Sequence, residues 1–155
     1  MTGLPPMTSG ESIEYCASEG VDVRMPEVDV VGDRLYGRID EVWLTNRAAY
    51  IIDNKPRSPN GDPYLSDKRQ VLDYCMAFKE QHPEYTLPVV GVVRDRDTGK
   101  HLWFKVFDDS DKCDLDDCIS RILDIANGLR EPVPTQKGQK CRVCRWSPSC
   151  DRVAS

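Results

Sequence analysis

An acid and a lysine flank a single residue in Asp53-Asn54-Lys55, at the end of the apolar run Tyr50 to Ile52. This apolar run is typical of a strand, and in a strand Asp53 and Lys55 point to the same face. A second acid, Asp40, lies thirteen residues before Asp53 in the segment GRIDEV. If both segments form neighbouring strands, the two carboxylates meet at one end of a sheet.

Two carboxylates at adjacent strand ends make a hard-oxygen site that suits Mg²⁺ or Mn²⁺. The backbone carbonyl of Asn54 could add a third oxygen. Lys55 would then stand beside a metal-bound water, which it could orient or deprotonate, or it could neutralise charge on an attacked phosphate. The alternative is that Asp53 and Lys55 form an ordinary surface ion pair.

A helix-like segment follows these residues and carries two further polar side chains. Gln70 and Tyr74 lie one helical turn apart, and Asp67 lies three residues before Gln70, so all three share one side of the helix. Gln70 and Tyr74 could therefore bind a phosphate or a base edge at the rim of the site. They could equally form a plain surface pair.

The elements that must position these residues follow from periodicity and turn signals. We expect one mixed central sheet flanked by helices, an α/β or α+β fold. The predicted helices are 9–19, 66–81 and 115–129, and the predicted strands are 22–31, 34–45, 48–55, 86–95 and 100–107. We expect a core domain over 1–130 and a linker with a cysteine-rich tail over 131–155.

Composition indicates a folded protein outside the membrane. The chain has 155 residues, 39% hydrophobic and 30% charged, and a net charge of −5. No apolar run approaches the roughly 20 residues that cross a bilayer, and the first residues lack the pattern of a secretory signal. We expect a cytoplasmic protein with no membrane partner. Residues 137–152 are locally basic, as phosphate contact requires. A solvated tail would have the same composition.

Seven cysteines are many for a reducing compartment. An odd number without a signal peptide favours metal or cluster chemistry over a disulfide framework. Three of them, Cys141, Cys144 and Cys150, follow a proline-containing linker. They could hold an iron–sulfur cluster, hold zinc, or remain thiols.

The segments GRID, IIDNK and QVLDY, in that order, resemble the PD-(D/E)XK nuclease superfamily of the RecB type. With the three tail cysteines, the sequence is most similar to the CRISPR-associated iron–sulfur RecB-like exonucleases, over roughly residues 10 to 150. The resemblance implies a restriction-endonuclease-like fold and a DNA exonuclease that uses a divalent metal.

Carried over residue by residue, the resemblance implies the following roles. Asp40 and Asp53 are metal ligands, Lys55 is catalytic, and Gln70 and Tyr74 lie at the rim of the active site. Cys141, Cys144 and Cys150 hold a 4Fe–4S cluster.

Two positions depart from the family pattern. The family places a histidine ligand on its first helix, whereas this chain has only His82 and His101, so Glu14 is the expected substitute. The fourth cluster cysteine lies earlier in the family than the single N-terminal candidate here, Cys16. We therefore expect Cys16 to complete the cluster, with zinc as the alternative cofactor.

Three functions stay open on the sequence alone. The first is a metal-dependent deoxyribonuclease that acts in CRISPR spacer acquisition or in DNA repair. The second is a catalytically degenerate subunit that binds DNA or an integrase-type DNA-processing partner. The third is a zinc-containing interaction module in which Asp53 and Lys55 are a surface pair.

Overall fold

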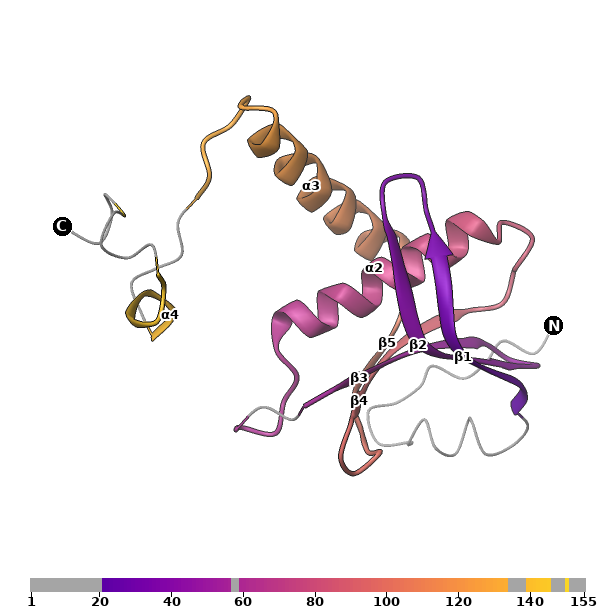
Figure 1. The fold of residues 1–155 in the computed structure, drawn as a ribbon. Coiled ribbons are helices and arrows are strands. Elements are labelled where there is room, and N and C mark those ends of the chain that lie inside the picture. Colours follow the sequence, from indigo (N-terminus) through magenta and orange to yellow (C-terminus); the bar gives the residue numbers. More distant parts are fainter. Residues whose placement is uncertain (1–20, 57–58, 134–138, 146–149, 151–155) are drawn as a thin grey trace. The chain divides into compact units, whose positions relative to one another are not determined.

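The computed structural model describes residues 21–56, 59–133, 139–145 and 150, and Figure 1 shows them as a ribbon. Their contacts divide the chain into two compact units, Met1–Asp117 and Cys118–Ser155. The predicted helix 9–19, with Glu14 and Cys16, lies outside the described residues. No helix in the described segments is long and apolar enough to span a membrane.

A five-stranded mixed sheet in the order β1-β2-β3-β4-β5 forms the centre of the first unit. Its strands are β1 (Val21–Val31), β2 (Tyr36–Thr45), β3 (Ala49–Lys55), β4 (Val89–Asp95) and β5 (His101–Val106). Strands β3 and β4 pair in parallel, whereas the other neighbours are antiparallel. The helices are α2 (Leu65–Gln81), α3 (Asp109–Ala126) and the short α4 (Gln139–Arg142). The predicted mixed sheet with flanking helices is confirmed.

Helix α2 makes the crossover between the parallel strands and covers one face of the sheet (Figure 1). Gly91 on β4 lets the helix approach closely, because a Cβ there would lie 3.2 Å from Cys75 Sγ and 3.3 Å from Val71 Cγ1. Cys75 is fully buried at this contact, and burial raises the pKa of its thiol. Cys75 is therefore a core thiol.

The opposite face of the sheet carries its own apolar cluster, made of Trp43, Ala48, Tyr50, Ile52, Val90 and Val92. Tyr50 and Ile52 are alternate residues of β3, so Asn54 points to this face as well. Asp53 and Lys55 consequently point to the face that α2 covers. Strand β3 therefore divides its polar end between the two faces of the sheet.

Helix α3 begins at Asp109, six residues before the predicted start at Leu115. The reason is a capping box. The Asp108 carboxylate accepts a hydrogen bond from the Asp111 N–H (2.9 Å), and the Asp111 carboxylate accepts one from the Asp108 N–H (3.2 Å). The acidic run at 108–117 thus starts the helix, where negative charge is favourable.

Candidate active site

The register of β2 and β3 brings Asp40 and Asp53 to adjacent positions. Glu41 pairs with Ile52 at the last rung of this antiparallel ladder, so Asp40 and Asp53 occupy the next position on each strand. Beyond this rung a side chain replaces the backbone as the hydrogen-bond partner: Asp40 Oδ2 accepts a hydrogen bond from the Asn54 N–H at 2.7 Å. The predicted convergence of the two acids at one sheet end is what the strands produce.

Asp53 is an almost fully buried carboxylate, 4% exposed. Burial raises its pKa, Lys55 opposes that rise, and the negative charges of Asp40 and Asp67 add to it. Lys55 Nζ lies 3.0 Å from Asp53 Oδ2. This is an ion-pair distance, but the approach does not have hydrogen-bond geometry, and Oδ2 has no hydrogen-bond donor among the described residues. A buried carboxylate this close to an ammonium is electrostatically paired whatever the angle.

The Lys55 side chain is 22% exposed, whereas that of Asp53 is 5% exposed. The pair is therefore no ordinary surface ion pair, since Asp53 is buried and Lys55 is only partly exposed. Buried acid–base pairs of this kind are common at functional sites.

Helix α2 presents Asp67, Gln70 and Tyr74 to the same region. Asp67 lies in its first turn and is near enough to raise the pKa of Asp53. Gln70 Nε2 donates a hydrogen bond to Tyr74 Oη at 2.8 Å, so the two predicted rim residues act as a pair. A Cβ at Gly37 of β2 would lie 2.5 Å from Tyr74 Cε1, so the glycine makes room for the tyrosine ring.

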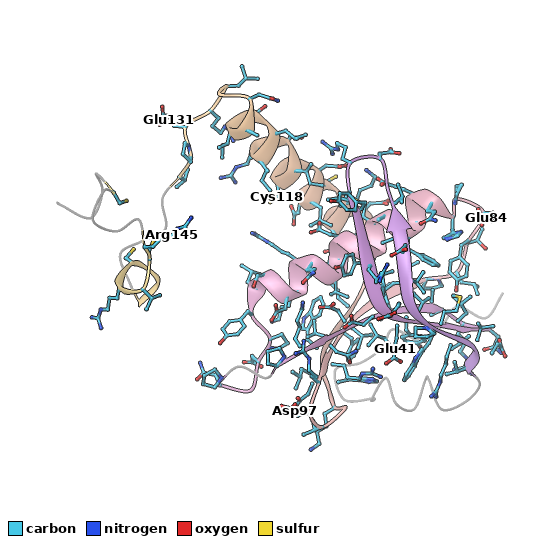
Figure 2. The ribbon with its side chains drawn as sticks, viewed as in Figure 1. Glu41, Glu84, Asp97, Cys118, Glu131 and Arg145 are labelled. Atoms are coloured by element: carbon cyan, nitrogen blue, oxygen red, sulfur yellow. The ribbon has the colours of Figure 1, made fainter. Side chains whose placement is uncertain are left out.

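An open cavity of about 460 Å³ lies beside the strand ends, lined by Glu27, Asp40, Asn54, Arg94, Asp95, Arg96 and Gly99. Figure 2 labels Glu41 of β2 and Asp97 in the turn between β4 and β5. Glu27, Arg94 and Arg96 were not predicted from the sequence. Isolated arginines carry no motif, and only the parallel pairing of β4 with β3 brings them to the site.

The donor chemistry around Asp53 fits a hard divalent cation. The carboxylates of Asp40 and Asp53 and the carbonyl of Asn54 are oxygen donors, and the buried Asp53 Oδ2 without a hydrogen bond is the kind of atom that a cation satisfies. Across the segments that the structure describes, no three His, Cys, Asp or Glu side chains lie close enough to hold a metal ion. Any further donor would come from water or from residues outside those segments, such as Glu14.

The predicted cluster ligands in the described part of the second unit form no disulfide. Cys141 is half-buried, and Cys144 and Cys150 are exposed. Within the described part of the tail they do not form a metal-binding group of three, and Cys16 lies outside the described residues. Their role in holding a cluster stays a prediction.

Comparison with known proteins identifies a family for this chain. A family model for the PD-(D/E)XK nuclease superfamily matches residues 8–151. No curated protein matches the chain.

Among solved structures, a protein from Eubacterium rectale named "Putative exonuclease" is 16% identical, with a TM-score of 0.50 over 88% of this chain and 55% of that one. The structure of SSO0001 is 18% identical, with a TM-score of 0.49 over 90% of this chain and 65% of that one. The chain thus spans less than two thirds of either protein. The mixed sheet is consistent with the restriction-endonuclease-like fold, and the chain belongs to the PD-(D/E)XK nuclease superfamily.

Proposed function

We propose that this protein is a metal-dependent DNA exonuclease of the RecB-like type that hydrolyses phosphodiester bonds. The observation that carries the proposal is the meeting of Asp40 and Asp53 at adjacent strand ends, with Lys55 Nζ 3.0 Å from the buried Asp53 carboxylate. The name of the Eubacterium rectale protein supports exonuclease activity, as does the order of the three motifs.

Asp40, Asp53 and the Asn54 carbonyl would hold Mg²⁺ or Mn²⁺, with Glu14 as a further ligand. When bound, such an ion activates water and stabilises negative charge on phosphate oxygens. Lys55, held in place by Asp53, orients or deprotonates the attacking water or donates to a phosphate oxygen. Gln70 and Tyr74 hold one another at the rim, where the tyrosine hydroxyl can turn its own proton to the substrate.

The finer assignments rest on the sequence resemblance. We propose a nuclease core over 1–130 and a tail over 131–155 in which Cys141, Cys144 and Cys150, with Cys16, hold a 4Fe–4S cluster, with Zn²⁺ as the alternative. The setting would be CRISPR spacer acquisition or DNA repair in the cytoplasm, with DNA and an integrase-type protein as partners.

One observation favours a second candidate, a degenerate subunit that binds DNA without cutting it. The family carries a histidine ligand on its first helix, whereas the two histidines of this chain, His82 and His101, both follow the core motifs.

Cleavage of linear and covalently closed circular DNA of one sequence separates these candidates. The protein is incubated with both substrates in Mg²⁺, in Mn²⁺ and in a chelator. We expect loss of the linear DNA in either metal, no loss in chelator, and an intact circle. Cutting of the circle would exclude an exonuclease, and DNA binding without cleavage in any metal would favour the degenerate subunit.

A further inference from the structure

The open cavity beside Asp40 has the size and position of a nucleotide subsite. Its volume of about 460 Å³ falls in the range of roughly 300–1,000 Å³ that is typical of small-molecule sites. Asp40 and Asn54 line it, and both belong to the proposed metal site. A ligand in the cavity would therefore lie next to Asp40 and Asn54 of the proposed metal site.

The two arginines of the cavity differ in how many hydrogen bonds their side chains make within the protein. Arg94 is fixed inside the protein: it donates to Glu41 and, at 2.7 Å, to Asn54 Oδ1, and it lies 5.8 Å from the centre of the Trp43 ring. Arg94 is thus a structural residue.

Arg96 is exposed, and among the described residues its side chain makes one long hydrogen bond, 3.4 Å to the Asn54 carbonyl. Its backbone N–H bonds the Lys55 carbonyl at 3.0 Å, which anchors Arg96 at the end of the proposed catalytic strand. Arg96 therefore has a fixed backbone and a guanidinium group without a carboxylate partner in the described segments. Such a group suits bidentate contact with a phosphate.

The acids of the cavity are engaged to different degrees. Asp95 is 2% exposed and accepts hydrogen bonds from the Asp97 N–H at 3.0 Å and the Thr98 hydroxyl at 2.7 Å, so it builds the turn. Asp40 caps β3. Glu27 has a φ of 49°, in the left-handed region that is strained for a non-glycine residue.

Glu27 also interrupts the β1–β2 ladder. Its neighbours pair normally, Pro26 with Glu41 and Val28 with Ile39, so Glu27 lies opposite Asp40 in register. Strained residues of this kind cluster at ligand sites. Glu27 lines the cavity from β1, and a carboxylate there could accept a hydrogen bond from a sugar hydroxyl or a base N–H.

We propose that this cavity binds the terminal nucleotide of a DNA strand, with Arg96 contacting the phosphate of that nucleotide. The inference rests on the proposed nuclease function and makes it more specific. A closed strand has no terminal nucleotide to place beside the proposed metal site, so the cavity would select ends.

Binding of mononucleotides tests the subsite without relying on cleavage. Isothermal titration in chelator uses thymidine 5′-monophosphate, thymidine 3′-monophosphate and thymidine as three separate probes. The proteins are wild type, Arg96→Ala and Lys100→Ala. Lys100 is the matched control, because it is an exposed cation of the same β4–β5 turn and does not line the cavity.

We expect one monophosphate to bind wild type and Lys100→Ala equally, and Arg96→Ala at least tenfold more weakly. Thymidine should bind weakly and alike to all three proteins. The monophosphate that binds identifies which end of the strand enters the cavity. Arg96→Lys, which keeps the charge but not the planar fork, should fall between wild type and Arg96→Ala.

Three results would overturn the subsite: Arg96→Ala binds like wild type, Lys100→Ala loses as much affinity, or neither monophosphate binds more tightly than thymidine. Failure of the proposed nuclease appears elsewhere, as absent DNA cleavage by a wild-type protein that still shows Arg96-dependent binding of a monophosphate.

Discussion

Asp40 combines a structural and a proposed chemical task within one carboxylate. One oxygen accepts a hydrogen bond from the Asn54 N–H at 2.7 Å, which links β2 to β3 just beyond their last backbone pair. The other oxygen is the proposed metal ligand. An amide keeps the acceptor and removes the charge, whereas alanine removes both. The two substitutions therefore separate the tasks.

We predict that Asp40→Asn loses nuclease activity and keeps nearly wild-type stability. Asp40→Ala should lose activity and also about 1–2 kcal/mol of unfolding free energy, because the half-buried Asn54 N–H loses its partner. Urea denaturation with DNA cleavage measures both effects. Equal stability of the two variants would show that the hydrogen bond contributes little.

Asp73 on α2 predicts how stability depends on pH. Burial raises its pKa from 3.8 to about 6, and Arg69 opposes that rise. The folded state therefore binds this proton more tightly than the unfolded state, so the contribution of Asp73 to stability is most favourable below about pH 4 and is lost as pH rises through 6. Above pH 7 the cost is on the order of 1–3 kcal/mol.

We predict that Asp73→Asn is more stable than wild type at pH 8 and that the difference shrinks towards pH 4. Urea midpoints at several pH values measure it. Asp97→Asn is the control, because Asp97 is exposed in the β4–β5 turn. A constant gap between Asp73→Asn and wild type at every pH would contradict the account.

Single residues were predictable where a motif marks them. Asp40, Asp53 and Lys55 carry their chemistry in type and spacing, and strand alternation placed the last two on one face. Arg96 and Glu27 were missed for physical reasons. Arg96 reaches the site only through parallel pairing across a helix crossover, and a positive φ at a glutamate has no sequence signature.

At the scale of elements, β2 and α2 approach each other closely at Gly37 and Tyr74. The Gly37 position allows the Tyr74 ring to lie against the strand, because a Cβ there would be 2.5 Å from Tyr74 Cε1. Gly37 lies three residues before Asp40 on β2, and Tyr74 lies on the helix that carries Gln70 and Asp67. The contact therefore fixes the distance between two parts of the proposed site.

We predict that Gly37→Ala costs about 1–3 kcal/mol of stability through overpacking and lowers cleavage by displacing Tyr74. Tyr74→Ala should relieve this clash, so the double variant should lose less stability than the sum of the single variants. Urea denaturation of the four proteins gives the coupling. Strict additivity would mean that the ring moves aside freely.

The elements themselves were largely predictable. Strands β1 to β3 follow the alternation and turn signals of their segments, and α2 follows its helical period. The start of α3 was missed because the run Asp108 to Asp117 reads as an acidic block, although its D-x-x-D spacing is a capping signal. The sequence does not show the cavity, which depends on where the β1–β2 ladder is interrupted.

At the scale of the whole molecule, the chain divides into two units, and the proposed site and the cavity belong entirely to the first, Met1–Asp117. The three tail cysteines belong to the second. A metal–thiolate site would supply folding energy to a tail with few apolar residues, which is a structural task separate from cleavage.

We predict that anaerobically purified protein contains iron and sulfide, and that replacing Cys141, Cys144 and Cys150 by serine removes both. Metal analysis with visible absorption measures the content. Replacement of Cys75, which is fully buried, should leave the iron content per folded protein unchanged. Zinc in place of iron would assign the alternative cofactor, and no metal in either protein would contradict a metal-bound tail.

The central claim is that Asp53 and Lys55 act together at a metal-dependent phosphodiesterase site. The most direct test is cleavage of end-labelled linear DNA in Mn²⁺ by wild type, Asp53→Asn, Lys55→Ala and the control Lys100→Ala, all checked for equal thermal unfolding. We expect wild type and Lys100→Ala to release nucleotides at equal rates, and Asp53→Asn and Lys55→Ala to be at least a hundredfold slower. Cleavage by Lys55→Ala or Asp53→Asn at the wild-type rate would contradict the account.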